Sequence, residues 1–83
     1  MPDFECRLKT YRQLKQMTQE ELAVMVGVRR ETIMRLEKAQ YNPSLKLAVD
    51  ISRAVGIPIE EIFIFDLEEF NSRDTSEKNG EKN

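Results

Sequence analysis

Residues 18–37 read TQEELAVMVGVRRETIMRLE, and this stretch decides the fold. Thr18 is followed three residues later by Glu21, which is the form of a capping box: each side chain bonds a free backbone N–H at the start of a helix. A helix is therefore predicted from about residue 19 to residue 26. Gly27 is suited to end it, because glycine adopts the left-handed conformation at little cost.

A second helix is predicted over about residues 29–38, directly after this turn. Ile33 and Leu36 are expected on its inward face, and the small side chain of Ala23 lets the two helices approach closely. Two short helices joined by a tight glycine turn constitute a helix-turn-helix unit. The second helix leaves polar side chains facing outward, namely Arg29, Arg30, Glu31, Thr32 and Arg35.

The outward side chains have the chemistry that reads double-stranded DNA. A helix fits the major groove, and its first turn meets the base edges. Arginine donates two hydrogen bonds to guanine, glutamate accepts one from cytosine, and threonine offers a hydroxyl or a methyl group. We therefore predict that bases are read by Arg30, Glu31, Thr32 and Arg35. Phosphate contacts are predicted at the start of the first helix and just after the second, for Thr18, Gln19, Lys38, Tyr41 and Asn42. The alternative is a solvated helical face in which Glu31 pairs with Arg35.

The rest of the chain divides into short helices with a strand near each end. A helix is predicted over about residues 7–16, with Leu8, Tyr11 and Leu14 or Lys15 at helical spacing. Another helix begins after Ser44 and ends at Gly56, with an apolar stripe of Leu47, Ala48, Ile51 and Val55. Pro58 is suited to be the first residue of a short fifth helix. Alternating residues at 3–6 and 62–70 predict two short strands that could pair with each other. The predicted fold class is all-α, a five-helix bundle with a short terminal β extension.

Composition limits both the domain count and the function. We expect one domain over residues 1–68 and a polar, disordered tail over 69–83. The net charge is −2, but residues 1–58 carry ten bases and seven acids, so the acidic excess lies in the remainder. No histidine is present and Cys6 is the only cysteine. With no nucleophile–base pair, metal cluster or phosphate loop, we expect no enzyme, no metal, no cofactor and no small-molecule ligand. No apolar run approaches about 20 residues and no signal peptide is visible, so we expect a cytoplasmic protein without a membrane partner.

Several linked motifs resemble a known family. The segments are TQEELA at 18–23, VGV at 26–28, ETI at 31–33, YNPSL at 41–45 and IEEIF at 59–63. Together they resemble the phage-repressor and Cro type of helix-turn-helix regulators, in the compact single-domain subgroup of bacteria and archaea. The resemblance spans about residues 7–65 and implies a five-helix bundle that works as a homodimer.

The resemblance also implies roles for single residues. Arg12 matches an arginine that pairs with the glutamate at Glu37, which is a structural role. Gln19 matches a glutamine that contacts a phosphate. Many relatives have serine at position 29 as a helix cap, so Arg29 is expected to reach a phosphate instead. Many also have serine where this chain has Pro58, which changes how the fifth helix is capped.

A homodimer is expected because a single short helix reads too few base pairs for useful specificity. The apolar residues near the C-terminal end exceed what a small core needs, so we assign the dimer interface to Ile57, Ile59, Ile62, Ile64, Phe65 and Leu67. The alternative is that they all belong to the core. The favoured function is a repressor that binds a palindromic operator. The alternatives are an antitoxin that neutralises a toxin, and a protein-interaction module that does not bind DNA.

Overall fold

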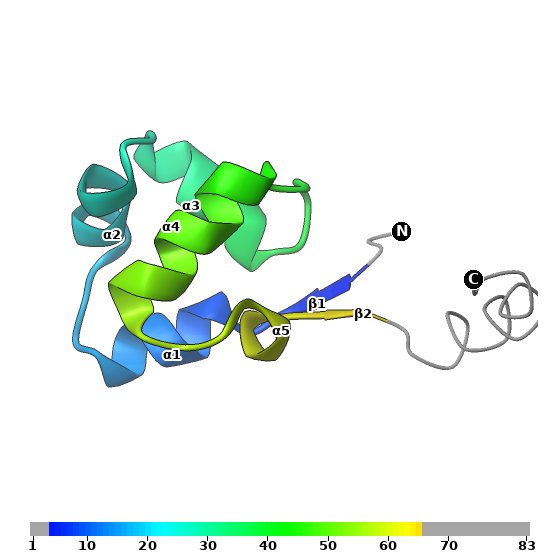
Figure 1. The fold of residues 1–83 in the computed structure, drawn as a ribbon. Coiled ribbons are helices and arrows are strands. Elements are labelled where there is room, and N and C mark those ends of the chain that lie inside the picture. Colours follow the sequence, from blue (N-terminus) through cyan, green and yellow to red (C-terminus); the bar gives the residue numbers. More distant parts are fainter. Residues whose placement is uncertain (1–3, 66–83) are drawn as a thin grey trace, which may run out of the picture.

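The computed structural model describes residues 4–65 (Figure 1). Within this range the chain forms five helices and two strands. In chain order they are β1 Phe4–Cys6, α1 Leu8–Leu14, α2 Gln19–Val26, α3 Arg30–Glu37, α4 Leu45–Val55, α5 Ile59–Ile62 and β2 Phe63–Phe65. The predicted fold class, a mostly helical bundle with a small β extension, is confirmed.

The capping box predicted for α2 is present. The Thr18 hydroxyl oxygen accepts a hydrogen bond of 3.0 Å from the Glu21 N–H, and the Thr18 N–H donates one of 2.9 Å to the Glu21 carboxylate. At the other end, Gly27 has a φ of 74° and the Val28 N–H donates to the Ala23 carbonyl at 3.0 Å. These bonds satisfy groups that a helix end otherwise leaves without partners, and they fix where the turn to α3 begins.

The longest helix, α4, begins and ends where the sequence predicts. The Ser44 hydroxyl accepts a hydrogen bond of 3.1 Å from the Leu47 N–H, and Gly56 ends the helix with a φ of 72°. Its buried residues are the predicted stripe of Leu47, Ala48, Ile51 and Val55. The helix therefore lies with one face on the core.

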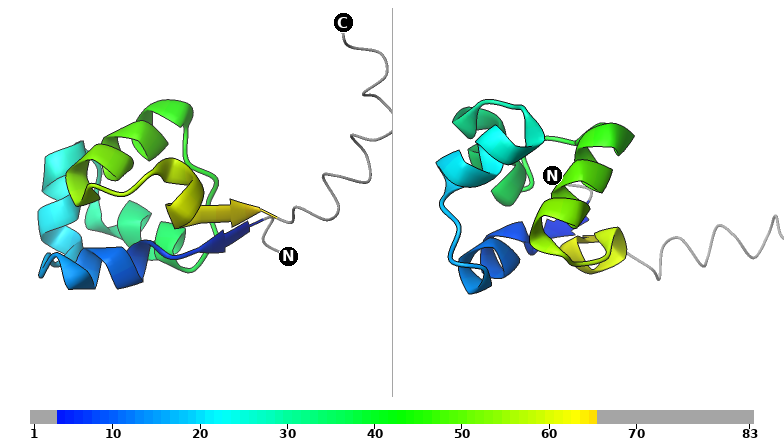
Figure 2. Two further views of the ribbon diagram at one scale, coloured as in Figure 1. Left: turned by 60° about the horizontal axis from the view of Figure 1, so that its bottom comes forward. Right: turned by 60° about the vertical axis from the view of Figure 1, so that its left-hand side comes forward.

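Figure 2 shows the five helices gathered around a common centre. Each helix contributes at least one fully buried side chain to the core there. These side chains are Leu8, Leu22, Ile33, Leu36, Ile51, Val55 and Ile62. Each contributes about 1.5–3 kcal/mol relative to an exposed position. Because α2 packs on both α3 and α4, the helix-turn-helix is supported by the rest of the bundle.

Two predicted helix bounds were wrong. The helix predicted over residues 7–16 is α1, and it ends at Leu14; Gln16 lies in the left-handed region with a φ of 58°. Leu14 does not face inward but is 72% exposed, because the chain turns towards α2 at this point. Pro58 is the residue before α5 and not its first residue.

The two strands come from opposite ends of the described chain and pair antiparallel, with Phe4 opposite Phe65 and Cys6 opposite Phe63. Figure 1 shows them side by side, extending away from the bundle. The Phe4 ring is buried and meets the Phe63 ring edge-on, at 5.8 Å between centroids. The predicted continuation of the second strand to residue 70, Leu67 and the predicted tail all lie outside the described residues.

Candidate nucleic-acid interface

The turn between α2 and α3 is held by two small or apolar residues and by a backbone hydrogen bond at Arg29. Ala23 is 1% exposed, so the backbones of the two helices approach closely, and Val28 packs against the core. Arg29 has extended backbone angles and its carbonyl accepts from the Thr32 N–H at 3.0 Å. The Arg29 side chain makes no capping bond and is exposed. Position 29 therefore presents an exposed guanidinium at the start of α3.

The outward face of α3 is strongly basic. Arg29, Arg30, Arg35 and Lys38 are all exposed, and Glu31 is the one exposed acid among them. Among residues 4–65, the ion pairs are Arg7–Glu5, Arg12–Glu37 and Lys46–Asp50, so none of these four cations takes part in one. The Glu31–Arg35 pair that the alternative required is not formed. Within the described part of the chain, these four cations are therefore not neutralised by a paired acid.

Two surface hollows gather the predicted DNA-contacting side chains. The first lies between the starts of α2 and α3 and is lined by Arg12, Thr18, Gln19, Glu20 and Arg30. It brings two predicted phosphate contacts together with a predicted base reader. The second lies along the later part of α3 and is lined by Glu31, Met34, Arg35, Lys38 and Gln40. Thr32 is half-buried and lines neither hollow; Tyr41 is 41% exposed and likewise lies apart from both.

Met34 is a functional candidate that the sequence reasoning did not select. Its side chain is half-buried and forms part of the hollow beside Glu31 and Arg35. The signal was available, because Met34 lies four residues after Arg30 and four before Lys38. Residues four apart share a face of a helix. An apolar group at such a position suits the methyl group of thymine.

A buried ion pair ties α1 to α3. Arg12 Nε lies 2.6 Å from Glu37 Oε2, and the two side chains are only 8% and 4% exposed. A second bond of 3.2 Å joins Arg12 Nη2 to Glu37 Oε1, and Arg12 Nη1 donates to the Met17 carbonyl at 2.8 Å. The structure thus contains the pair that the family resemblance implied. Gln19, which the sequence assigned only to phosphate, also donates to Glu37 Oε1, at 3.0 Å.

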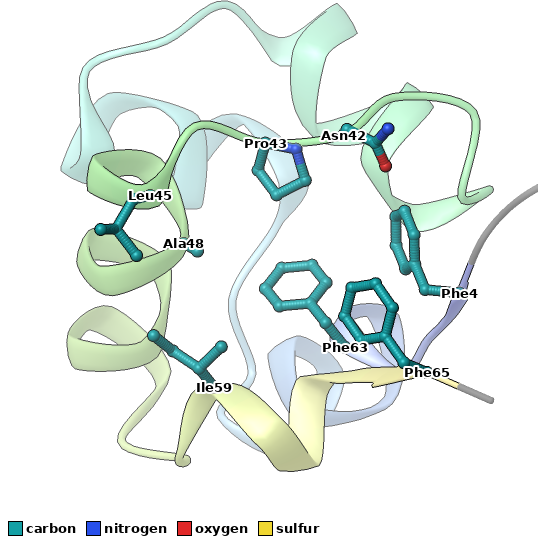
Figure 3. A pocket seen from close by; sticks show the side chains of 8 residues that line it. All are labelled: Phe4, Asn42, Pro43, Leu45, Ala48, Ile59, Phe63 and Phe65. Atoms are coloured by element: carbon teal, nitrogen blue, oxygen red, sulfur yellow. The ribbon is translucent and has the colours of Figure 1, made fainter. Parts of the chain in front are cut away.

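An apolar hollow of about 400 Å³ lies where β2 meets the loop before α4 (Figure 3). It brings together the predicted interface residues Ile59 and Phe65 with side chains that the sequence reasoning did not assign to an interface, namely Phe4, Pro43, Leu45, Ala48 and Phe63. Leu45 and Phe65 are 79% and 57% exposed. Asn42, predicted to contact a phosphate, lines this hollow as well.

The assignment of Ile62 to the dimer interface needs correction. Its side chain is fully buried in the core of the monomer, because α5 turns it towards the centre of the bundle. Ile57 and Ile59 are half-buried and pack against the core, and Ile64 is half-buried in β2. These three retain some accessible surface, whereas Ile62 has none.

Cys6 is a free, half-buried thiol in β1. Burial raises the pKa of the Cys6 thiol above its ordinary value of 9.0; a hydrogen bond with the backbone of Leu8 acts in the opposite direction, and the nearby carboxylate of Glu37 adds to the rise. The thiol is therefore protonated at neutral pH. This protonation favours a packing role over a reactive one.

No helix within residues 4–65 has the length and apolar character needed to cross a bilayer. Residues 4–65 contain the parts of a helix-turn-helix domain. These are a capped α2, a glycine turn and an α3 with a basic outward face.

Comparison with known proteins places this domain in a family. The Helix-turn-helix family matches residues 8–62, which is the span from the start of α1 to the end of α5. The chain belongs to the Cro/C1-type family of helix-turn-helix DNA-binding transcriptional regulators. This confirms the resemblance drawn from the sequence motifs.

Relatives in sequence and structure agree with this placement. An HTH-type transcriptional regulator of Archaeoglobus fulgidus is 64% identical over 63 residues, covering 76% of this chain and 89% of the relative. One of Methanocaldococcus jannaschii is 51% identical over 63 residues, covering 76% and 96%. The crystal structure of the restriction-modification controller protein C.AhdI from Aeromonas hydrophila is similar with a TM-score of 0.62 and 33% identity, over 66% of this chain and 83% of that one.

Proposed function

We propose that this chain is a transcriptional repressor that binds a palindromic operator in double-stranded DNA as a homodimer, with α3 in the major groove. The observation that carries the proposal is the outward face of α3. It holds four exposed cations and one acid, and the ion pairs of residues 4–65 use none of the four. Cations free of protein partners are the groups that displace counterions from phosphates and donate to base edges.

In this proposal the side chains divide into two sets by position. Bases are read from the first two turns of α3 by Arg30, Glu31, Thr32 and Arg35. Phosphates are contacted around that helix by Thr18, Gln19, Arg29, Lys38, Tyr41 and Asn42. The shared hollow of Thr18, Gln19 and Arg30 is compatible with this division, because a phosphate at the start of α2 would lie next to the base that Arg30 reads.

The homodimer would use the surface around the apolar hollow, where Leu45, Ile59 and Phe65 lie. Of the other residues assigned to the interface, Ile57 and Ile64 retain accessible surface but do not line the hollow, and Leu67 lies outside the described residues. Leu45 and Phe65 expose large apolar side chains to solvent, and Phe65 lies at the end of β2 where a second copy could reach it. Two copies related by a twofold axis would place their α3 helices in successive major grooves, about 34 Å apart.

Selection of random duplex oligonucleotides, with affinity then measured against salt, tests the DNA proposal. We expect enrichment of a palindrome. Arg30→Ala should cost about 1–3 kcal/mol of specific binding and relax one position of each half-site. Lys46→Ala is the matched control, because Lys46 is an exposed cation on α4 whose Nζ pairs with Asp50. Enrichment of no palindrome, or equal binding by the Arg30 and Lys46 variants, would contradict the proposal.

Sedimentation tests the dimer separately from DNA binding. We expect a dimer at tens of micromolar, and Phe65→Asp should shift it to a monomer because a charge would lie in an apolar contact. Val24→Asp is the control: Val24 is 70% exposed on α2 and does not line the hollow. A monomeric wild-type protein, or equal effects of both substitutions, would count against this interface.

The sign of regulation needs its own measurement. With the selected operator placed over a reporter promoter, the wild-type protein should lower transcription, and Arg30→Ala should not. Higher transcription with the wild-type protein would overturn the repressor assignment and leave the DNA-binding assignment intact.

A further inference from the structure

The carboxylate of Glu37 lies at the meeting point of three helices. It is at the end of α3, it pairs with Arg12 of α1, and it accepts a hydrogen bond of 3.0 Å from the Gln19 side chain at the start of α2. Its side chain is 4% exposed, so Glu37 itself does not reach a ligand at the surface. Gln19 does, because it is only half-buried and lines the hollow that Arg30 shares.

The bond to Glu37 determines which way the Gln19 amide faces. A carboxylate accepts hydrogen bonds and cannot donate them, so the amide must turn its nitrogen, and not its oxygen, towards Glu37. One of the two N–H groups of Nε2 is used in this bond. The other N–H remains available, on a nitrogen whose position is fixed.

Arg12 restrains the Glu37 carboxylate to which the Gln19 amide is bonded. Its guanidinium holds both oxygens of the carboxylate, at 2.6 and 3.2 Å, and also donates to the Met17 carbonyl at 2.8 Å. Met17 is the second residue before Gln19, so the same arginine restrains the backbone that enters α2 and the carboxylate that holds the Gln19 side chain. The ion pair with Arg12 forms through atoms other than those of Gln19, so the bond from Gln19 is an additional contact that restrains the glutamine side chain.

We propose that Glu37 is a positioning residue for DNA binding, which acts by holding the Gln19 amide, before DNA arrives, with one N–H free for a phosphate oxygen. The inference rests on the proposed function, in which Gln19 contacts a phosphate. A long polar side chain loses rotamer freedom when it is immobilised, and a side chain ordered in the free protein does not lose that freedom on binding. The same link joins the start of α2 to the end of α3, so the phosphate contact and the base-reading helix keep one fixed spacing.

A double-mutant cycle on operator affinity tests the proposal. Gln19→Met keeps the length of the side chain without its donor, and Glu37→Asp keeps the charge beside Arg12 while it withdraws the acceptor from Gln19. We expect each substitution alone to weaken binding about tenfold, which is the size of one hydrogen bond to a charged group. The double variant should bind no more weakly than Gln19→Met, because a side chain without a donor gains nothing from being positioned. The salt dependence should not change, since Gln19 carries no charge.

The outcomes separate this inference from the function on which it rests. If Glu37→Asp weakens binding by the same factor in the Gln19→Met variant as in the wild-type protein, Glu37 acts independently of Gln19 and the positioning role is overturned. If Gln19→Met leaves affinity unchanged while the wild-type protein binds its operator, the phosphate contact fails and the positioning role with it, whereas DNA binding stands. Gln13→Ala is the control, because Gln13 is exposed on α1 and lies outside the hollow.

A measurement on the wild-type protein covers the case in which Glu37→Asp does not fold. Nuclear magnetic resonance of the side-chain amides in the free protein should show the Gln19 NH₂ group as ordered, with one hydrogen-bonded proton, and the Gln13 group as mobile. Equal mobility of the two groups would overturn the proposal, because Gln19 would then not be held before binding.

Discussion

The substitution Arg12→Met tests the buried ion pair that joins α1 to α3. It keeps most of the side-chain volume but removes the charge, which leaves the Glu37 carboxylate and the Met17 carbonyl without their partners. Breaking a buried pair in this way costs about 3–5 kcal/mol, mostly because the remaining charge is desolvated and uncompensated. A chain of this length has a total stability of about 4–12 kcal/mol. One substitution should therefore remove a large part of it.

The exposed pair Lys46–Asp50 provides the matched comparison. Its nitrogen–oxygen distance is 2.6 Å, the same as that of Arg12–Glu37, but the Lys46 side chain is 84% exposed whereas that of Arg12 is 8% exposed. Solvent screening limits such a pair, four residues apart on a helix, to about 0.3–0.5 kcal/mol. Two pairs of equal length should thus differ about tenfold in what their loss costs, mainly because one is buried and the other is exposed.

Chemical denaturation followed by circular dichroism measures both variants. Arg12→Met should lower the midpoint far more than Lys46→Met, and the corresponding melting temperature should fall by more than about 10 °C. The double variant Arg12→Met, Glu37→Met should recover part of the loss, since it leaves no unpaired charge. If Arg12→Met cost less than about 1 kcal/mol, or if the double variant were less stable than the single one, the reasoning from desolvation would be refuted.

Two further predictions concern Met34 and Cys6. Replacing one thymine in a single half-site by uracil should weaken binding of the wild-type protein about fourfold, the contribution of one buried methyl group. The same replacement should not weaken binding of Met34→Ala, and equal losses in both proteins would exclude a methyl contact at this position. The pKa of the Cys6 thiol is higher in the folded protein than in the unfolded chain. The stabilisation linked to this shift is therefore complete at pH values below the pKa of the unfolded chain, and it is lost as the pH rises above about 9. Between pH 7 and pH 10 the free energy of unfolding should fall more in the wild-type protein than in Cys6→Ala. A fall of the same size in both proteins would show that groups other than Cys6 cause it.

Much of the bundle could be predicted because its helix ends are locally encoded. Thr18 with Glu21, Gly27, Ser44 and Gly56 each act through their own few neighbours, and the structure places the ends of α2 and α4 at these residues. The end of α1 has no such signal. Leu14 continued the apolar spacing, yet Gln16 has a φ of 58° and the Met17 N–H donates to the Arg12 carbonyl, so the chain leaves the helix there. That choice depends on where α2 must lie and not on residues near Leu14.

The candidate interface divides in the same way. The outward face of α3 follows from helical spacing alone, and so the sequence could select Arg30, Glu31 and Arg35. The pairing of the two strands could be predicted from their alternating residues, and the structure confirms it. The place of Asn42 beside the aromatic rings could not, because it depends on how the loop before α4 packs against those strands. The bond from Gln19 to Glu37 joins residues 18 positions apart, on helices whose relative placement is set by packing. Local patterns therefore identify which groups can meet DNA, whereas the contacts that orient them require the folded bundle.

The distribution of charge reconciles an acidic chain with an interface for a polyanion. Interactions between exposed charges are largely screened beyond about 8–10 Å at physiological salt, so the net charge of −2 matters less to a phosphate than the charges close to it. Near α3 those charges are four cations and Glu31, and the acid of the first hollow, Glu20, lies beside Thr18 and Gln19. Glu20 repels an approaching phosphate. The uncharged donors beside it, on Thr18 and Gln19, have no charge of their own to offset this repulsion, so their hydrogen bonds to the phosphate depend on correct orientation more than a lysine contact would. A held Gln19 meets that requirement, and it explains why an interface built on a basic helix also contains a glutamine fixed by a buried carboxylate.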